Sequence, residues 1–118
     1  MALGRILFVD DDENIRFLLQ EELSLAGHEV VVAPDGARAL ELLDEIHPDL
    51  VILDLKMPGM DGLTVLGAIR RRAPDVPVVV FSAYCEPAHQ ALEQGANACV
   101  AKSADLTELH RQVSRYCA

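Results

Sequence analysis

Two kinds of hydrophobic pattern alternate along this chain of 118 residues. Continuous apolar runs of four to six residues, rich in Val and Ile, recur five times, and such runs are typical of strands that are buried on both faces. These predicted strands are residues 6–9, 30–33, 50–53, 76–81 and 98–101. Between and after them, apolar residues recur three and four positions apart, which predicts amphipathic helices.

Four helical segments have this spacing clearly, at residues 15–26, 39–46, 65–69 and 106–116. A fifth segment, 86–94, has few large apolar residues and contains Pro87, which a helix accepts only in its first turn, so we predict a short helix there. Asp35 and Asp105 are predicted helix N-caps, and Gly27 and Gly95 are predicted left-handed C-caps. Five strands alternating with five helices predict an α/β fold, a parallel sheet with helices on both faces.

Length, composition and charge restrict the class of protein. A chain of this length, with 51% hydrophobic and 25% charged residues, is expected to form one globular domain over residues 1–118. Its 10 basic and 19 acidic residues give a formal net charge of −9. Because this charge repels phosphate backbones and anionic bilayers, we expect neither direct nucleic-acid binding nor membrane binding.

The cysteines and the N-terminus indicate where the protein works. Cys85, Cys99 and Cys117 are odd in number and form no CxxC pair, which favours neither a disulfide framework nor a zinc site. The apolar run before Asp10 is too short for a signal peptide or a membrane span. We therefore expect a cytoplasmic protein.

Polar residues follow four of the five predicted strands. Because the carboxyl ends of parallel strands meet at one edge of a sheet, these side chains should lie together. They are Asp10, Asp11 and Asp12 after the first strand, Asp54 after the third, Ser82 after the fourth and Lys102 after the fifth. Carboxylates gathered in this way repel one another, and a hard divalent cation relieves the repulsion. The sequence therefore predicts an acidic Mg²⁺ site.

This arrangement suits phosphoryl chemistry, with Asp54 at the end of the most apolar strand as the predicted nucleophile. Asp10 and Asp11 would serve the metal, and Ser82 and Lys102 would meet the phosphoryl group. Each residue alone has an ordinary structural explanation, such as a turn serine or a surface lysine. Their joint occurrence at four strand ends favours a site, whereas Asp12 is expected to be an N-cap.

Several segments resemble the receiver domain of two-component response regulators, and the resemblance spans the whole chain. The matching segments are ILFVDDDENIR, VILDLKMPGMDG, VVFSA and VAK. The resemblance implies a flavodoxin-like, doubly wound sheet of five parallel strands in the order 2-1-3-4-5. It also implies Mg²⁺-dependent transfer of a phosphoryl group to Asp54 from a sensor histidine kinase or a phosphotransfer protein.

The resemblance also assigns roles to single positions. Asp11, Asp54 and the backbone carbonyl of Lys56 would ligate the metal directly, and Asp10 would contribute through water. Ser82 would bond a phosphoryl oxygen and Lys102 would pair with the phosphoryl group. The domain would catalyse its own phosphorylation and dephosphorylation, with no separate turnover reaction.

Signalling, by the same resemblance, would pass through the fourth helix, the fifth strand and the fifth helix to a downstream protein or output domain. A free-standing receiver and a piece of a longer regulator both fit the end of the chain. Cys99 stands where the family commonly has an aromatic residue and is too small to fill that space, and Ser103 replaces a common proline. Lys56 and Tyr84 stand where the family controls access of attacking water.

Three other functions agree less well with the sequence. A phosphorylation-independent interaction module that keeps the receiver fold stays open, favoured by Cys99 and disfavoured by the acidic positions. A haloacid dehalogenase-type phosphatase is disfavoured because Leu55 and Lys56 follow Asp54, so the DxDxT pattern is absent. A flavodoxin is disfavoured because Asp10 and Asp11 would repel the flavin phosphate.

The remaining polar residues suggest structural roles. The four histidines lie on different predicted elements, so neither a metal cluster nor a histidine phosphate relay is expected. Arg70, Arg71 and Arg72 end the third predicted helix, where we expect a solvated face that suits the helix dipole. Cys117 lies near the chain end, a position that favours exposure.

Overall fold

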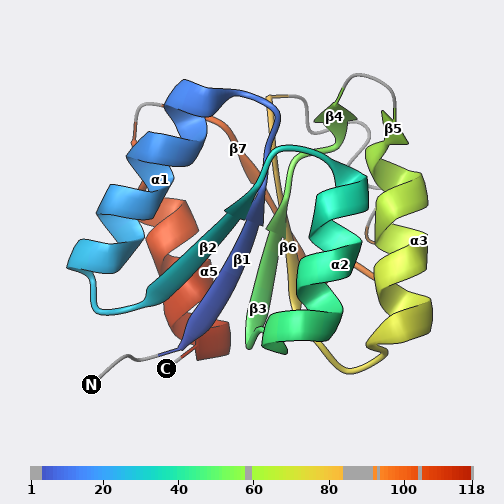
Figure 1. The fold of residues 1–118 in the computed structure, drawn as a ribbon. Coiled ribbons are helices and arrows are strands. Elements are labelled where there is room, and N and C mark those ends of the chain that lie inside the picture. The colour runs from blue at the N-terminus through green and yellow to red at the C-terminus, as the bar shows by residue number, and fades with distance from the viewer. Residues whose placement is uncertain (1–3, 58–59, 84–91, 93, 104, 118) are drawn as a thin grey trace.

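The computed structural model describes residues 4–57, 60–83, 92, 94–103 and 105–117. Its main sheet has five parallel strands in the order β2-β1-β3-β6-β7 (Figure 1). These strands are β1 (Arg5–Val9), β2 (Glu29–Ala33), β3 (Leu50–Leu53), β6 (Val78–Ser82) and β7 (Ala98–Ala101). Two strands of two residues each, β4 (Lys56–Met57) and β5 (Met60–Asp61), form a separate antiparallel ribbon. Without this ribbon the order is the predicted 2-1-3-4-5.

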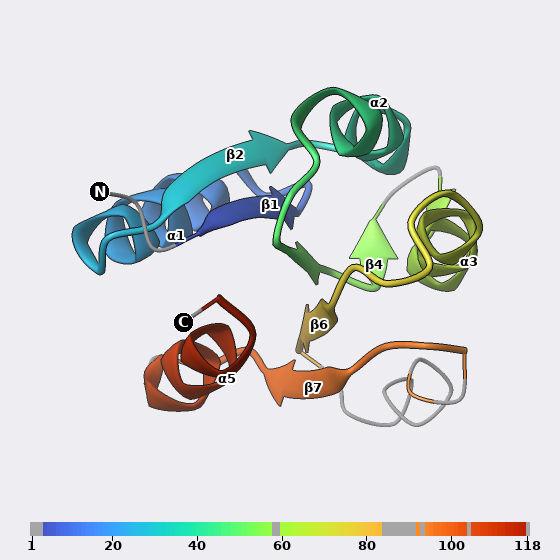
Figure 2. The ribbon, with the colours of Figure 1, turned by 90° about the horizontal axis from the view of Figure 1, so that it is seen from below.

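Helices cover both faces of the sheet, as predicted. In the described part of the chain they are α1 (Glu13–Leu25), α2 (Gly36–Ile46), α3 (Gly62–Arg72) and α5 (Thr107–Cys117). Figure 2 shows α1 and α5 on one face and α2 and α3 on the other. The predicted helix at 86–94 lies outside the described residues, apart from Leu92 and Gln94.

The core consists of two layers, one on each face of the sheet. Along β1, Ile6 and Phe8 pack in the layer beneath α1 and α5, whereas Leu7 and Val9 pack in the layer beneath α2 and α3. All four side chains are fully buried. Because alternate residues enter opposite layers that are both apolar, the strands contain no polar alternation, which explains their continuous hydrophobic runs.

The predicted N-caps Asp12 and Asp35 are confirmed. Asp12 accepts hydrogen bonds from the N–H groups of Asn14 and Ile15, and Asp35 accepts one from Arg38. Asp105 accepts one from the N–H of Thr107, the first residue of α5, at 2.9 Å. Gly27, directly after the C-cap of α1, has a φ of 104°. Gly95 has a φ of 112°, but its role as a helix C-cap stays a prediction because the helix predicted before it lies mostly outside the described residues. The sequence did not predict that His47, with φ of 48°, ends α2.

The prediction that Arg70 lies on a solvated face is wrong. Its Nε donates to the carbonyl of Gly95 at 2.8 Å, Nη1 to the carbonyl of Val76, and Nη2 to Oδ1 of Asn97 at 2.9 Å. Asn97 Oδ1 also accepts from the N–H of Val78 at 3.0 Å. Arg70 therefore joins the end of α3 to the segments that lead into β6 and β7.

Cys117 is also placed differently from the expectation. It is the last residue of α5, is 3% exposed and packs in the same core layer as Phe8. Burial, followed by the negative charge of Asp49, raises the pKa of its thiol to about 11. A thiol in this state is a poor nucleophile at neutral pH.

None of the helices in the described residues has both the length and the apolar composition of a membrane span.

Candidate functional site

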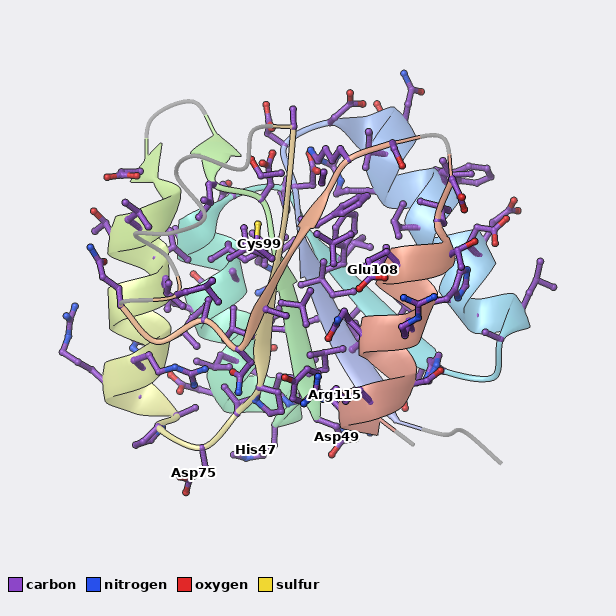
Figure 3. All side chains as sticks on the ribbon, turned by 180° about the vertical axis from the view of Figure 1, so that it is seen from behind. His47, Asp49, Asp75, Cys99, Glu108 and Arg115 are labelled. Carbon is purple, nitrogen blue, oxygen red and sulfur yellow. The ribbon has the colours of Figure 1, made fainter. Side chains whose placement is uncertain are left out.

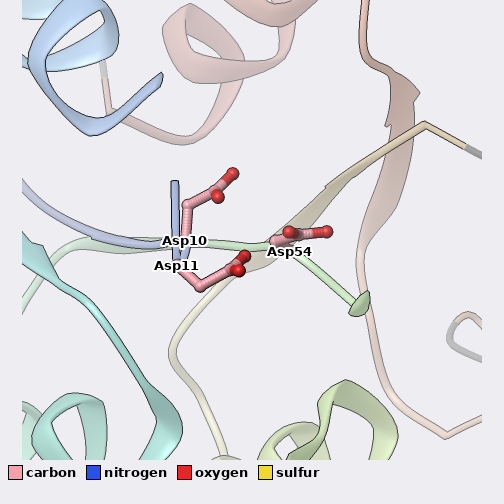
Figure 4. Close-up of side chains that lie close together, drawn as sticks. All are labelled: Asp10, Asp11 and Asp54. Atoms are coloured by element: carbon pink, nitrogen blue, oxygen red, sulfur yellow. The ribbon is translucent and has the colours of Figure 1, made fainter. Parts of the chain in front are cut away.

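Three carboxylates meet at the carboxyl edge of the sheet. Asp10 and Asp11 follow β1, and Asp54 follows the adjacent strand β3. One ligand oxygen from each lies within 4.8 Å of those from the other two (Figure 4). Asp10 and Asp54 are 0% and 3% exposed, whereas Asp11 is exposed. The predicted convergence of these three residues is confirmed.

Asp10 is held by hydrogen bonds through its backbone and its side chain. Its N–H donates to the carbonyl of Ala33 at 3.1 Å, which extends the β1–β2 pairing by one residue. Its Oδ1 accepts from the N–H of Asp12 at 2.9 Å, and its carbonyl accepts from Nη1 of Arg16 at 2.8 Å. Its Oδ2 lies 2.7 Å from Nζ of Lys102. Both carboxylate oxygens of Asp10 thus have protein donors.

Asp54 is positioned by the centre of the sheet. Its N–H donates to the carbonyl of Val9 at 3.0 Å, so the backbone at Asp54 is fixed beside the end of β1. After it, the N–H of Gly62 donates to the carbonyl of Leu55 at 3.1 Å. A Cβ atom at position 62 would lie 2.4 Å from Cα of Leu55, so this close approach requires glycine. The chain at Gly62 therefore lies directly against Leu55, the residue that follows Asp54.

Lys102, directly after β7, supplies a positive charge to this site. Its N–H donates to the carbonyl of Ser82 at 2.8 Å, and its Nζ lies 3.2 Å from Oδ2 of Asp54. The same ammonium lies 5.8 Å from the centre of the Phe81 ring. Burial disfavours the ammonium, but the hydrogen bond and charge of Asp10, together with Asp54, outweigh it and raise the pKa of Lys102. Lys102 is therefore protonated at neutral pH.

The other predicted site residues lie at the same edge. Ser82 is the last residue of β6, 1% exposed, and pairs in register with Ala101 directly before Lys102. Lys56 opens the β4–β5 ribbon and pairs with Asp61. Tyr84 lies outside the described residues. The chemical roles given to Ser82 and Lys56 stay predictions.

Cys99 and Ser103, two positions that the resemblance singled out, are described on and after β7. Cys99 is half-buried and packs against the core layer of α2 and α3 (Figure 3). Ser103, directly after Lys102, donates from its Oγ to the carbonyl of Asp105 at 2.8 Å. Because Asp105 in turn accepts from Thr107, the loop between Lys102 and α5 is held by local hydrogen bonds.

The donor atoms of this site fit Mg²⁺. Mg²⁺ prefers carboxylate and carbonyl oxygens and retains several of its waters, so it needs a site that is open to solvent. Asp10 and Asp54 provide buried carboxylates, and Asp11 provides an exposed one. Lys102 offsets only part of the negative charge of the three carboxylates. A divalent cation would offset the rest.

Arg16 is a member of this site that the sequence reasoning missed. It lies on α1, is half-buried, and contacts the backbone rather than a carboxylate. Its position in the segment DDDENIR, one helical turn after the cap Asp12, was the available signal. That signal is weak, because arginines at such positions are commonly solvated.

Comparison with known sequences identifies relatives over the whole chain. The sequence model of the response regulator receiver domain matches residues 6–114. Sporulation initiation phosphotransferase F from Bacillus subtilis is 36% identical over 118 residues, which cover 98% of this chain and 95% of that protein. The regulatory protein AtoC from Escherichia coli is 42% identical over 116 residues. The chain spans about a quarter of the length of AtoC and of the regulator NtrC from the same species.

Solved structures show the same fold. The response regulator TrrA from Thermotoga maritima, in complex with Mg²⁺–BeF, aligns with a TM-score of 0.90 and 40% identity, covering 98% of this chain and 99% of that one. The chemotaxis protein CheY4 from Vibrio cholerae aligns with a TM-score of 0.89 and 28% identity, covering 98% of each chain. Since sequence and fold agree over nearly its full length, this chain belongs to the receiver domains of two-component response regulators.

Proposed function

We propose that Asp54 accepts a phosphoryl group from a phosphohistidine of a sensor histidine kinase or a phosphotransfer protein, and that this switches the domain between two signalling states. The observation that carries the proposal is that Asp54 belongs to two groups at once. It lies within the three-carboxylate cluster, and it contacts Lys102 at 3.2 Å. A carboxylate between a cation site and a lysine is suited to attack phosphorus.

Asp54 is the best nucleophile of the three carboxylates. Asp10 is 0% exposed, and its Oδ1 accepts from the N–H of Asp12, so its carboxylate holds the start of α1. Asp11 is exposed, so water competes for its carboxylate. Asp54 is 3% exposed and directly follows β3, the strand in the middle of the sheet. Burial of the nucleophile next to a fixed ammonium favours a preorganised site.

The transfer step would exchange one bond to phosphorus for another. A carboxylate oxygen of Asp54 forms the new P–O bond while the P–N bond to the donor imidazole breaks. The electron pair of the broken bond remains on that imidazole nitrogen, and the ring leaves as a neutral imidazole because its other nitrogen carries a proton. Lys102 supplies positive charge to the phosphoryl oxygens, and Ser82 supplies a hydroxyl hydrogen bond.

Mg²⁺ would be held by Asp11, Asp54 and the carbonyl of Lys56, with Asp10 contributing through water. When bound, it supplies positive charge that neutralises the phosphoryl oxygens during transfer. The chemistry of the donor set supports this choice, as does the Mg²⁺–BeF complex of the related TrrA.

Phosphorylation adds charge at the point where the signalling surface begins. A phosphoryl group carries about −1.5 to −2 charges at neutral pH. Lys102 connects Asp54 with the loop that starts α5, and its N–H pairs with the carbonyl of Ser82. A shift of Lys102 toward the phosphoryl group would therefore displace the surface made by the predicted fourth helix, β7 and α5. We infer that a downstream protein or output domain responds to this surface, and that residues 1–118 act as one receiver domain.

Incubation with acetyl phosphate and Mg²⁺, followed by intact-mass spectrometry, tests the proposal. One phosphoryl adduct is expected, and it should be absent from Asp54→Asn and from a sample with EDTA. Asp11→Ala should need more Mg²⁺ for the same extent of labelling. An unlabelled protein that is folded and binds Mg²⁺ would instead favour a phosphorylation-independent interaction module, after a histidine phosphodonor has also failed.

A further inference from the structure

Arg16 connects α1 with the backbone of the acidic site. Its Nη1 donates to the carbonyl oxygen of Asp10 at 2.8 Å. Asp10 follows the last residue of β1 and is 0% exposed, so its carbonyl lies in an environment where an unpaired acceptor is costly. The guanidinium therefore provides, from the neighbouring helix, a hydrogen bond to the residue that follows β1.

The loop between β1 and α1 has further bonds that act on the same residues. The N–H of Asp12 donates to Oδ1 of Asp10, and the side chain of Asp12 caps α1 at Asn14. Asp11 lies between these bonded residues and is exposed. Its place in the carboxylate cluster is thus set by the backbone of Asp10 and Asp12, and Arg16 fixes the backbone of Asp10 through its hydrogen bond.

We propose that Arg16 is a positioning residue for the acidic site, which holds Asp10 and Asp11 in the arrangement that binds a divalent cation beside Asp54. This inference rests on the proposed function. Arg16 acts through the Asp10 carbonyl and does not touch the phosphoryl group or the metal. Contacts of this kind, one step removed from the ligands, strongly affect metal affinity.

The charge and the position of Arg16 have opposite effects on Mg²⁺ affinity. Removing a positive charge near a cation site strengthens cation binding, because like charges repel. Removing the hydrogen bond weakens binding, because the backbone of Asp10 and Asp11 is less well placed. The sign of the change in affinity therefore separates positioning from simple electrostatics.

The test is the Mg²⁺ dissociation constant of Arg16→Met, measured by calorimetry at constant ionic strength. Arg38→Met is the matched control, because it removes the same charge from the protein. Arg38 lies on α2 and pairs with Glu41. The Kd for Mg²⁺ should rise about tenfold in Arg16→Met and stay unchanged in Arg38→Met. A Kd equal to or below that of the wild type in Arg16→Met would overturn the inference.

A second readout needs neither metal nor phosphorylation. In EDTA, amide hydrogen exchange at Asp12 should be faster in Arg16→Met than in the wild type, because its acceptor Asp10 is less fixed. Exchange at Leu63 serves as the internal control, since that amide bonds to the Asp61 side chain at 3.1 Å at the start of α3. Equal acceleration at both amides would indicate general destabilisation and contradict a positioning role.

Failure of the positioning role of Arg16 and failure of the proposed function give different results. If Arg16→Met does not fold, Arg16→Gln takes its place, because its neutral side chain is too short for the bond, and the same criteria apply. A wild-type protein that binds Mg²⁺ and is phosphorylated, with Arg16→Met behaving identically, overturns the inference alone. A wild-type protein that binds no Mg²⁺ overturns the inference and the metal-dependent part of the proposed function.

Discussion

The ammonium nitrogen of Lys102 lies 3.2 Å from a carboxylate oxygen of Asp54, and both side chains are largely buried. The same nitrogen lies 2.7 Å from Asp10. One lysine thus offsets two buried carboxylates that come from different strands. This contact joins the nucleophile of the proposed reaction to the residue that follows β7, a strand of the proposed signalling surface.

Lys102→Met should destabilise the metal-free protein. Removing one partner of a buried ion pair leaves an uncompensated charge and costs about 3 kcal/mol. Mg²⁺ should stabilise this variant more than the wild type, because a bound cation would replace the lost positive charge. Urea unfolding at neutral pH, with EDTA and with Mg²⁺, measures both effects.

Arg71→Met is the control for this change, since Arg71 is exposed and its loss alters the net charge equally. We expect Arg71→Met to lower the free energy of unfolding by less than about 0.5 kcal/mol. Identical stabilisation of Lys102→Met and the wild type by Mg²⁺ would show that the cation and Lys102 do not share the same carboxylates.

Gly62→Ala should be strongly destabilising. Its Cβ would lie 2.4 Å from Cα of Leu55 and 2.6 Å from the carbonyl oxygen of Leu55, so the backbone of the loop after Asp54 would have to move. We expect a loss of about 2 kcal/mol or more in the free energy of unfolding.

Gly67→Ala provides a matched comparison on the same helix. There the nearest atom to a new Cβ is Nη1 of Arg71 at 3.6 Å, an ordinary contact with a flexible side chain. Alanine favours helix over glycine, so this variant should be about 0.5–1 kcal/mol more stable. Equal urea midpoints for the two variants would contradict the close approach of Gly62 to Leu55.

Arg70→Met should lower the stability of the protein more than Arg71→Met does, although the two residues are adjacent. Arg70 donates to the carbonyls of Gly95 and Val76 and to the side chain of Asn97. Losing these bonds should reduce stability by about 1–2 kcal/mol, against less than about 0.5 kcal/mol for the exposed neighbour. Thermal unfolding of the two variants measures the difference, and equal melting temperatures would argue against the contacts of Arg70.

His28 should make stability depend on pH below neutrality. Burial, followed by repulsion from His110 on α5, lowers the pKa of His28. Nδ1 of His28 has no hydrogen-bond partner in the described residues, and Glu22 of α1 lies 3.5 Å from His110. The unfolded chain binds a proton at His28 below about pH 6.5, whereas the folded protein resists it. Stability therefore falls as the pH falls below that value.

His28→Gln removes this titration. Between about pH 7.5 and pH 5.5, around the ordinary histidine pKa, the urea midpoint of the wild type should fall further than that of the variant. If the urea midpoints of the wild type and of His28→Gln fall equally with pH, His28 has the same pKa in the folded and unfolded chains.

The sheet and its acidic edge could be predicted because both follow from local patterns. Strands buried on two faces have no polar alternation, so β1, β3 and β6 stand out as apolar runs. In a parallel sheet the residues after such strands share one edge, so Asp10 and Asp54 are expected to meet regardless of the details of packing. Their contact with Lys102 follows from the same geometry.

The roles of Arg16 and Arg70 could not be predicted in this way. Both donate mainly to backbone carbonyls, and a carbonyl gives no signal in the sequence that it needs a partner. Arg70 also depends on Gly95 and Asn97, which reach it only through the packing of β7 beside β6. Cys117 is buried because α5 packs along its whole length on the sheet, which its position near the chain end did not indicate.

The measurement that tests the central claim most directly is the location of the phosphoryl group. The protein is labelled with acetyl phosphate and Mg²⁺, the acyl phosphate is reduced with borohydride, and the reduced residue is found by peptide mass spectrometry. The account predicts reduction at Asp54 alone, with none in Asp54→Asn. Reduction at Asp10 or Asp11, or unchanged labelling of Asp54→Asn, would contradict the assignment of Asp54 as the nucleophile.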